Sequence, residues 1–181
     1  STVASVDLAL QNVAHFGDTD VLPFPFENHF LRESQQTARA LVLNCSENFD
    51  SLFPLSPPHH ESMLSRLGYS GFRWITQLDP IWNAWYLSKI VEIAPAAEAR
   101  RIPVADGVVY SYRFRPDASD GTLFADDSGW TKFRERGLAL CEEHAFAVKT
   151  DIADFYPRVS HANLRASLAA IASREVADQV D

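Results

Sequence analysis

The stretch that most constrains the fold is AFAVKTDIADFYPRVSH, residues 145–161, in which a strand-like apolar run ends in two carboxylates. The run Ala145–Ile152 predicts a strand. A strand buries its residues, and burying a carboxylate without a partner is costly. Asp151 and Asp154 are therefore expected to meet a metal ion, an arginine or open solvent.

The composition limits the class of protein to which this chain can belong. With 181 residues and 46% hydrophobic side chains, the chain can bury a core in one or two domains, and it is neither disordered nor fibrous. No apolar run approaches the roughly 18 residues of a membrane span, and no signal-peptide pattern is present at the N-terminus. Cys45 and Cys141 fit no metal or redox motif and are expected to be reduced thiols of a cytoplasmic protein, although a single bridge stays open.

The charge is negative and unevenly distributed. The net charge of −8 argues against a general nucleic-acid-binding surface, which needs clustered Lys and Arg. Residues 1–99 carry 5 basic and 11 acidic side chains, whereas residues 100–158 carry 9 and 10. The second half of the chain is close to balanced, which leaves room there for a local basic face.

The first half is predicted to be helical. Apolar spacing predicts helices over Val3–Phe16, with Gly17 as the stop, and over Glu33–Phe53. The proline- and serine-rich residues 54–62 are predicted to be a linker. Asp79 and Pro80 form a good cap and first turn for a helix through residue 94, which Pro95 bends or ends. Trp82 and Trp85 on this helix are expected to pack against other helices.

The second half mixes strand and helix patterns. Val108–Phe114 is predicted to be a strand that a turn at 117–121 connects to Leu123 and Phe124. A helix capped by Asp127 or Ser128 should follow over 130–144, interrupted at Gly137, then the strand Ala145–Ile152 and a capped helix over 160–180. The fold class is therefore α+β.

Asp151 has the chemistry of a magnesium ligand. A short, stiff carboxylate at the end of a strand can hold Mg²⁺ against a substrate phosphate, and the Ile152 carbonyl next to it supplies another hard oxygen. Phe155 and Tyr156 would form a flat wall beside a bound sugar. The structural alternative is an aspartate that caps a turn, with both aromatics in the core, and for an isolated Asp-x-x-Asp this alternative is favoured. A phosphatase pattern is disfavoured because residues 151 and 154 stand three apart.

The segment VKTDIADFYPRVSHANL, residues 148–164, resembles the first catalytic palm motif of reverse transcriptases, especially bacterial enzymes of the retron, abortive-infection and antiphage-defence type. RIPVADGVVYSYRF (101–114) is similar to their finger hairpin and LFADDSGWTKFRERG (123–137) to the segment between fingers and palm. HFGDTDVLPFPFE (15–27) and GFRWITQLDPIWNAWYL (71–87) resemble the N-terminal extension of defence-associated members. The resemblance covers nearly the whole chain in the right order.

The resemblance implies a domain order and a role for each motif residue. Residues 1–99 would be a helical extension supporting the fingers, 100–144 the finger hairpin and connecting helix, and 145–181 the start of the palm of a right-hand polymerase. Asp151 would be the catalytic aspartate bridging two metal ions, with the Ile152 carbonyl as a further ligand. The remaining matches lie along the path of the incoming nucleotide: Asp154 and Phe155 beside the triphosphate, Tyr156 as the steric gate at the sugar, and Arg113 as the fingers arginine.

Two departures from the family pattern limit what this chain can do. Many relatives carry lysine where Val104 stands, and the Tyr-x-Asp-Asp hairpin that completes the metal site is missing after Asp151. Phe124–Asp127 imitates that hairpin but lies upstream of the first motif, and it is interpreted as a turn and helix cap. Arg101 and Arg115 compete with Arg113 as the triphosphate ligand, and Arg113 could instead pair with an acidic neighbour.

The resemblance therefore predicts the N-terminal part of an RNA-directed DNA polymerase that is inactive alone. Its cofactor would be Mg²⁺, and its partners an RNA template, a DNA or protein primer, deoxynucleoside triphosphates and the rest of the polymerase chain. Two other interpretations stay open. One is a non-catalytic module that binds RNA or a protein, and the other is a small Mg²⁺-dependent hydrolase that uses Asp151 and Asp154 as a pair.

Overall fold

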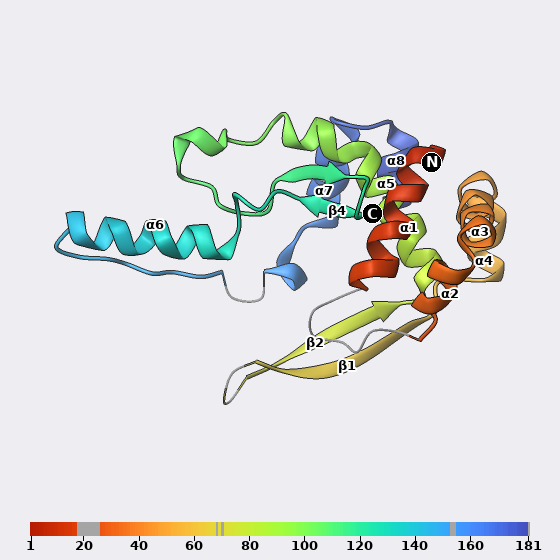
Figure 1. Ribbon diagram of the computed structural model, residues 1–181, viewed down its shortest axis with the longest axis horizontal. Helices are drawn as coiled ribbons and strands as arrows, with labels where there is room; N and C mark the ends of the chain where they lie inside the picture. The colour runs from red at the N-terminus through yellow and green to blue at the C-terminus, as the bar shows by residue number, and fades with distance from the viewer. Residues whose placement is uncertain (18–25, 68, 70, 153–154, 181) are drawn as a thin grey trace. The chain divides into compact units, whose positions relative to one another are not determined.

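The computed structural model describes residues 1–17, 26–67, 69, 71–152 and 155–180. The candidate site residue Asp154 lies outside them, as does most of the connector after Gly17. The chain divides into two compact units, which are described separately (Figure 1). Unit 1 consists of residues 1–92 and 117–122, and unit 2 consists of residues 93–116 and 123–181.

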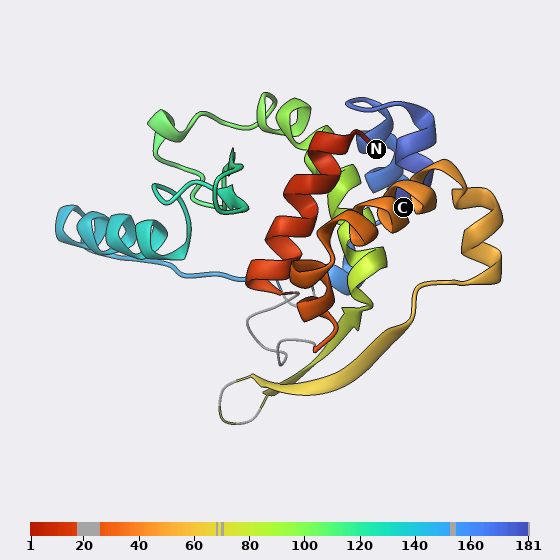
Figure 2. The same cartoon turned by 45° about the vertical axis from the view of Figure 1, so that its right-hand side comes forward.

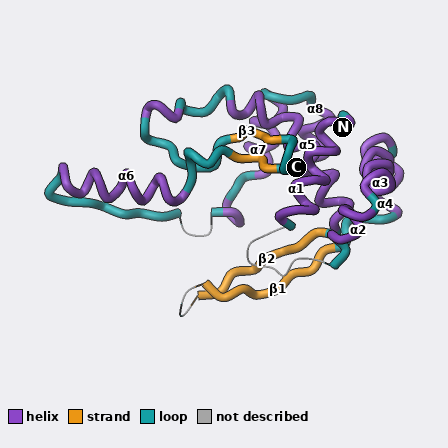
Figure 3. The backbone as a smooth tube through the Cα atoms, viewed as in Figure 1, coloured by secondary structure: helices purple, strands orange, loops and turns teal. Residues whose placement is uncertain are grey.

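Unit 1 is built from helices and one long hairpin (Figures 1 and 3). Its helices are α1 (Val3–Phe16), α2 (Asn28–Glu33), α3 (Gln35–Glu47), α4 (Phe49–Leu55) and most of α5 (Pro80–Glu98). Strands β1 (His60–Leu67) and β2 (Gly71–Leu78) pair in an antiparallel hairpin. The core of the unit consists of apolar side chains from α1, α2, α3 and α5, among them Val6, Leu10, Val13, Leu31, Val42, Trp82 and Trp85.

Local signals in the sequence account for the ends of α1 and α5. The Thr2 hydroxyl accepts a hydrogen bond from the Ser5 N–H (3.2 Å), and Gly17, at φ 74°, ends α1. The Asp79 carboxylate accepts from the Trp82 N–H (3.1 Å), and Pro80 occupies the first turn of α5. The predictions for these two helices are confirmed, although α5 continues through Pro95 to Glu98.

The tryptophans on α5 pack against an N-terminal helix within unit 1. Trp82 and Trp85 are buried, and the Trp85 ring stacks on Phe49 of α4 with ring centroids 4.8 Å apart. Phe53 meets Trp82 edge-to-face at 5.8 Å. Aromatic pairs of this kind contribute beyond the area that they bury. They hold α4 against α5 in unit 1.

The prediction of a linker over residues 54–62 is wrong at both ends. Pro54 lies inside α4, and β1 begins at His60. The β1–β2 hairpin itself is a structure that the sequence analysis did not anticipate. Its eight residue pairs run from His60↔Leu78 to Leu67↔Gly71.

Unit 2 contains short strands and several helical segments. After the end of α5 come a 3₁₀ turn (Val104–Asp106), β3 (Phe114–Asp117), β4 (Thr122–Phe124), α6 (Trp130–Glu143), a second 3₁₀ turn (Tyr156–Arg158), α7 (His161–Ala169) and α8 (Arg174–Val180). The tip of the β3–β4 hairpin belongs to unit 1. A hairpin was predicted here, but with its first strand earlier in the chain.

The predicted strand Val108–Phe114 forms only at its last residue. The Arg101 guanidinium donates hydrogen bonds to the carbonyl oxygens of Ser111 and Tyr112, and the Ser128 hydroxyl also donates to the Ser111 carbonyl (3.0 Å). These side chains occupy acceptors that a neighbouring strand would need. Extended pairing therefore starts only at Phe114.

Two helix predictions in unit 2 need correction. Neither Asp127 nor Ser128 caps α6, whose N-cap is Gly129, and Gly137 does not interrupt the helix. The predicted last helix is two helices, because Ser173 caps a new one by accepting from the Val176 N–H (3.3 Å). The predicted cap of the first, Ser160, is confirmed. The chain is thus α+β, with two small antiparallel sheets among the described residues.

The structure bears on two further expectations. Cys45 is buried and Cys141 exposed, and both are free thiols. Within the described part of the chain, no helix combines the length and the apolar character needed to cross a membrane.

Candidate nucleotide and metal site

The predicted strand Ala145–Ile152 is not a strand in this chain. Residues 144–152 form an extended loop that runs back along α6 after the helix ends (Figures 1 and 2). Across the described residues, no backbone group of 145–152 bonds to another strand. We call residues 145–152 the palm segment. The prediction failed because a strand needs a partner strand, and this segment has none in the part of the chain that the structure describes.

The palm segment exposes side chains that a strand in a sheet would bury. Phe146 is 91% exposed and Val148 is 88% exposed. The Lys149 ammonium lies over the Trp130 ring of α6, 5.8 Å from the ring centroid. Isolated exposed apolar residues are ordinary, but consecutive ones on extended backbone indicate a surface that pairs with something else.

Asp151 stands at the end of the palm segment with its carboxylate in solvent. One carboxylate oxygen accepts a hydrogen bond from the Ile152 N–H (2.9 Å). Ile152 is also exposed. The carboxylate is therefore accessible. Of the three expected partners of its charge, a metal ion, an arginine or solvent, it is solvent that surrounds it here.

The two aromatic residues of the motif follow in the Tyr156–Arg158 turn. The rings of Phe155 and Tyr156 meet edge-to-face with centroids 5.4 Å apart, and both are exposed, Tyr156 to 85%. The turn is closed by hydrogen bonds from the Arg158 N–H to the Phe155 carbonyl (3.0 Å) and from the Val159 N–H to the Tyr156 carbonyl (3.2 Å). The alternative in which these aromatics belong to the core is therefore wrong for this chain.

The donor set at Asp151 does not by itself fit a two-metal site. A carboxylate and a carbonyl are hard oxygen ligands that suit Mg²⁺, but each of two ions needs anionic support of its own. Among the described residues, no three His, Cys, Asp or Glu side chains lie together in a way that could hold a metal ion. Asp154 lies outside the described residues.

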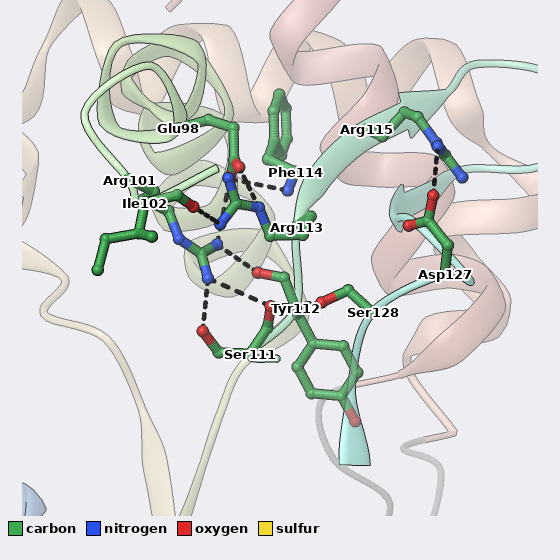
Figure 4. A network of polar contacts seen from close by, with 10 residues as sticks. All are labelled: Glu98, Arg101, Ile102, Ser111, Tyr112, Arg113, Phe114, Arg115, Asp127 and Ser128. Atoms are coloured by element: carbon green, nitrogen blue, oxygen red, sulfur yellow. Dashed lines mark hydrogen bonds and ion pairs between the residues drawn. The ribbon is translucent and has the colours of Figure 1, made fainter. Parts of the chain in front are cut away.

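Arg113 lies elsewhere in unit 2, in a network centred on Glu98 (Figure 4). The residue is only 9% exposed, and its guanidinium forms an ion pair with the Glu98 carboxylate (2.5 Å) and donates to the Ile102 carbonyl (2.9 Å). The alternative of pairing with an acidic neighbour is thus realised, but the neighbour is on α5, not on the hairpin. To bind a triphosphate, Arg113 would have to leave Glu98.

Two further groups share the Glu98 carboxylate. Arg101 donates to its other oxygen (3.1 Å), as does the Phe114 N–H (3.1 Å). Partial burial acts to raise the pKa of Glu98, but the Phe114 hydrogen bond and the charges of Arg101 and Arg113 lower the pKa below its ordinary value on balance. Arg115, by contrast, forms an exposed ion pair with Asp127 (3.1 Å).

Sequence reasoning missed Glu98. Glu98 and Arg101 stand three residues apart, a spacing that brings side chains together on a helix, but the predicted helix was expected to bend or end at Pro95, before either residue. The exposed aromatics of β2 were also missed, although the segment GFRWITQL alternates in the way expected of a strand.

In comparisons with known proteins, no protein-family model, curated protein or solved structure matched the chain. Function is therefore inferred from the residues and their geometry.

Proposed function

We propose that this chain is the N-terminal part of an RNA-directed DNA polymerase of the bacterial antiphage-defence type, acting in the cytoplasm, with Asp151 as a catalytic carboxylate. The observation that carries the proposal is the palm segment. It has the sequence of a buried strand, yet it is extended, exposed and without a partner strand among the described residues. The strand that carries the first palm motif would be exposed and unpaired in this way if the other strands of its sheet were absent.

The position of Asp151 is also what the proposal requires. The residue ends the palm segment, and its carboxylate is open to solvent. Further carboxylates would have to come from a Tyr/Phe-x-Asp-Asp hairpin in the same protein. Bound magnesium would then supply the charge that stabilises the transferring phosphate. The residues described here hold one carboxylate of such a site, so residues 1–181 alone are expected to be inactive.

Tyr156 is proposed to select the sugar of the incoming nucleotide. Its ring is exposed five residues after Asp151 and rests edge-to-face against Phe155. A flat ring at that place packs against a deoxyribose and excludes a 2′-hydroxyl by steric contact. Phe155 would then support the ring of Tyr156.

Sugar selection gives the experiment that tests the proposed function. Template-directed incorporation of deoxyribo- and ribonucleotides is measured on an RNA template with a DNA primer, using the full-length protein that contains these residues. We expect the wild type to prefer deoxyribonucleotides. Tyr156→Ala should reduce that preference at least about tenfold, because a methyl-sized side chain no longer excludes the 2′-hydroxyl.

The matched control is Tyr156→Phe, which keeps the ring and should keep the preference. If the full-length protein incorporates no nucleotides but binds RNA, the non-catalytic interpretation replaces the polymerase. Incorporation with an unchanged sugar preference in Tyr156→Ala would show that Tyr156 is not the steric gate at the sugar.

A further inference from the structure

The β1–β2 hairpin carries a row of exposed apolar and aromatic side chains on one face. Directly opposed residues of an antiparallel pair share a face, and the register opposes Leu64 with Trp74 and Arg66 with Phe72. These four side chains therefore lie together. Trp74 is 72% exposed and Phe72 is 68% exposed. Tyr69, in the turn between the strands, is almost fully exposed.

This face is not used to build unit 1. The hairpin extends away from the helices of the unit (Figures 1 and 2), and neither Phe72 nor Trp74 belongs to its core cluster. In the described part of the chain, the rings of Phe72 and Trp74 contact no other aromatic ring, whereas Trp82 and Trp85 each contact several. An exposed face with two large rings is costly in water and marks a binding surface.

The charge of the hairpin differs from that of its surroundings. Residues 60–78 contain two arginines, Arg66 and Arg73, and one acidic residue, Glu61. The rest of residues 1–99 contains three basic and ten acidic side chains. The hairpin is therefore the basic, aromatic part of an acidic region, and this charge favours a polyanionic partner over a basic or neutral one.

We propose that the face formed by Leu64, Arg66, Phe72 and Trp74 binds single-stranded nucleic acid. Rings two residues apart on one strand lie about 7 Å from each other, so each can stack on its own base. Arg66 donates to the Tyr69 carbonyl (3.2 Å), and its guanidinium has five N–H donors, enough to hold a phosphate as well. Arg73 projects from the opposite face of the same strand and adds charge.

A protein partner fits this face less well. A protein strand would pair with the open edges of β1 or β2 through backbone groups and would not need the two rings. Sheet faces that present aromatic rings to stack on unpaired bases are an established way of binding single strands. The proposal rests on the hairpin alone and would stand even if Asp151 had no catalytic role.

The test is fluorescence anisotropy with the 181-residue protein and two labelled probes, a 12-nucleotide oligo(U) RNA and a 12-nucleotide oligo(dT) DNA. We expect binding of at least one probe, weakened at least about tenfold by Phe72→Ala with Trp74→Ala, because each lost ring removes one stacked base. Met63→Ala, a partly exposed apolar side chain on the other face of the hairpin, is the matched control and should leave affinity within twofold.

The salt dependence separates phosphate binding from stacking. Each of Arg66→Gln and Arg73→Gln should reduce the slope of log affinity against log salt by about 0.7, the value for one phosphate contact on a single strand. A preference for the RNA probe would indicate contacts to the 2′-hydroxyl, and equal binding would indicate stacking and phosphate contacts alone. Both results support the proposal.

Three results would overturn it. The first is absence of binding to both probes. The second is binding that the Phe72→Ala/Trp74→Ala variant retains with an unchanged circular dichroism spectrum. The third is self-association of the wild type in sedimentation that the same variant abolishes, which would assign the face to a second copy of the chain. The circular dichroism spectrum of each variant shows whether the fold is intact, so a misfolded variant is not mistaken for a loss of binding.

Discussion

At the scale of single residues, Glu98 connects the end of α5 to the chain before and within β3. Its single carboxylate accepts hydrogen bonds from Arg101 and the Phe114 N–H and forms an ion pair with Arg113. Arg113 is nearly buried, so loss of Glu98 would leave its guanidinium without its anionic partner. Removing one member of a buried pair costs far more than removing an exposed pair.

The lowered pKa of Glu98 predicts a pH-dependent contribution to stability. Because the folded-state pKa lies below the ordinary value, the ionised carboxylate stabilises the protein above that value, and this contribution is lost as the pH falls through the folded-state pKa. Glu98→Gln should lower the free energy of unfolding at pH 7 by about 1–2 kcal/mol, less than for a fully buried pair because water reaches the carboxylate. Its profile between about pH 5 and 3 should be flatter than that of the wild type.

Urea unfolding at several pH values measures this effect. Asp127→Asn removes the exposed partner of Arg115 and is the matched control, with an expected change below about 0.5 kcal/mol. Parallel pH profiles for the wild type and Glu98→Gln would show that Glu98 does not carry the predicted linkage.

At the scale of elements, two glycines should respond to alanine in opposite directions. Gly121, in the turn between β3 and β4, has φ +79°, and a Cβ there would stand 2.9 Å from the Gln11 backbone of α1. Gly137 lies inside α6, and a Cβ there would meet nothing within 4 Å. We expect Gly121→Ala to destabilise the protein by at least about 1–2 kcal/mol and Gly137→Ala to stabilise it by about 0.5–1 kcal/mol.

Thermal unfolding of the two variants, each compared with the wild type, measures both changes. A stabilising effect of Gly121→Ala would mean that the turn does not approach α1 as closely as described. The direct polar contact between these segments is the hydrogen bond from the Asn12 side chain to the Gly121 carbonyl (2.9 Å).

The contrast between helices and strands explains which elements the sequence could predict. The helices α1 and α5 carry their own start signals, in Thr2 and in Asp79 with Pro80, and these act within one turn. Strands depend on distant partners. Val108–Arg113 has the composition of a strand, but the Arg101 guanidinium donates hydrogen bonds to two of its carbonyl oxygens. That contact could not be predicted from the pattern of residues 108–113.

At the scale of the whole molecule, the candidate site also has a part that the sequence could predict and a part that required the fold. Asp151, Ile152, Phe155 and Tyr156 are neighbours in the chain, so their proximity required no knowledge of the fold. The location of Arg113 did require it, since its side chain is held by a residue fifteen positions earlier, Glu98. The domain order 1–99, 100–144 and 145–181 remains a prediction.

The central claim, that Asp151 is a catalytic carboxylate of a polymerase, is tested most directly by primer extension with magnesium in the full-length protein. The account predicts a rate reduced at least about a thousandfold in Asp151→Asn, which keeps the shape of the side chain but removes its charge. Asp126→Asn, in the exposed turn that follows β4, should extend the primer at close to the wild-type rate. Extension by Asp151→Asn at the wild-type rate would contradict the account.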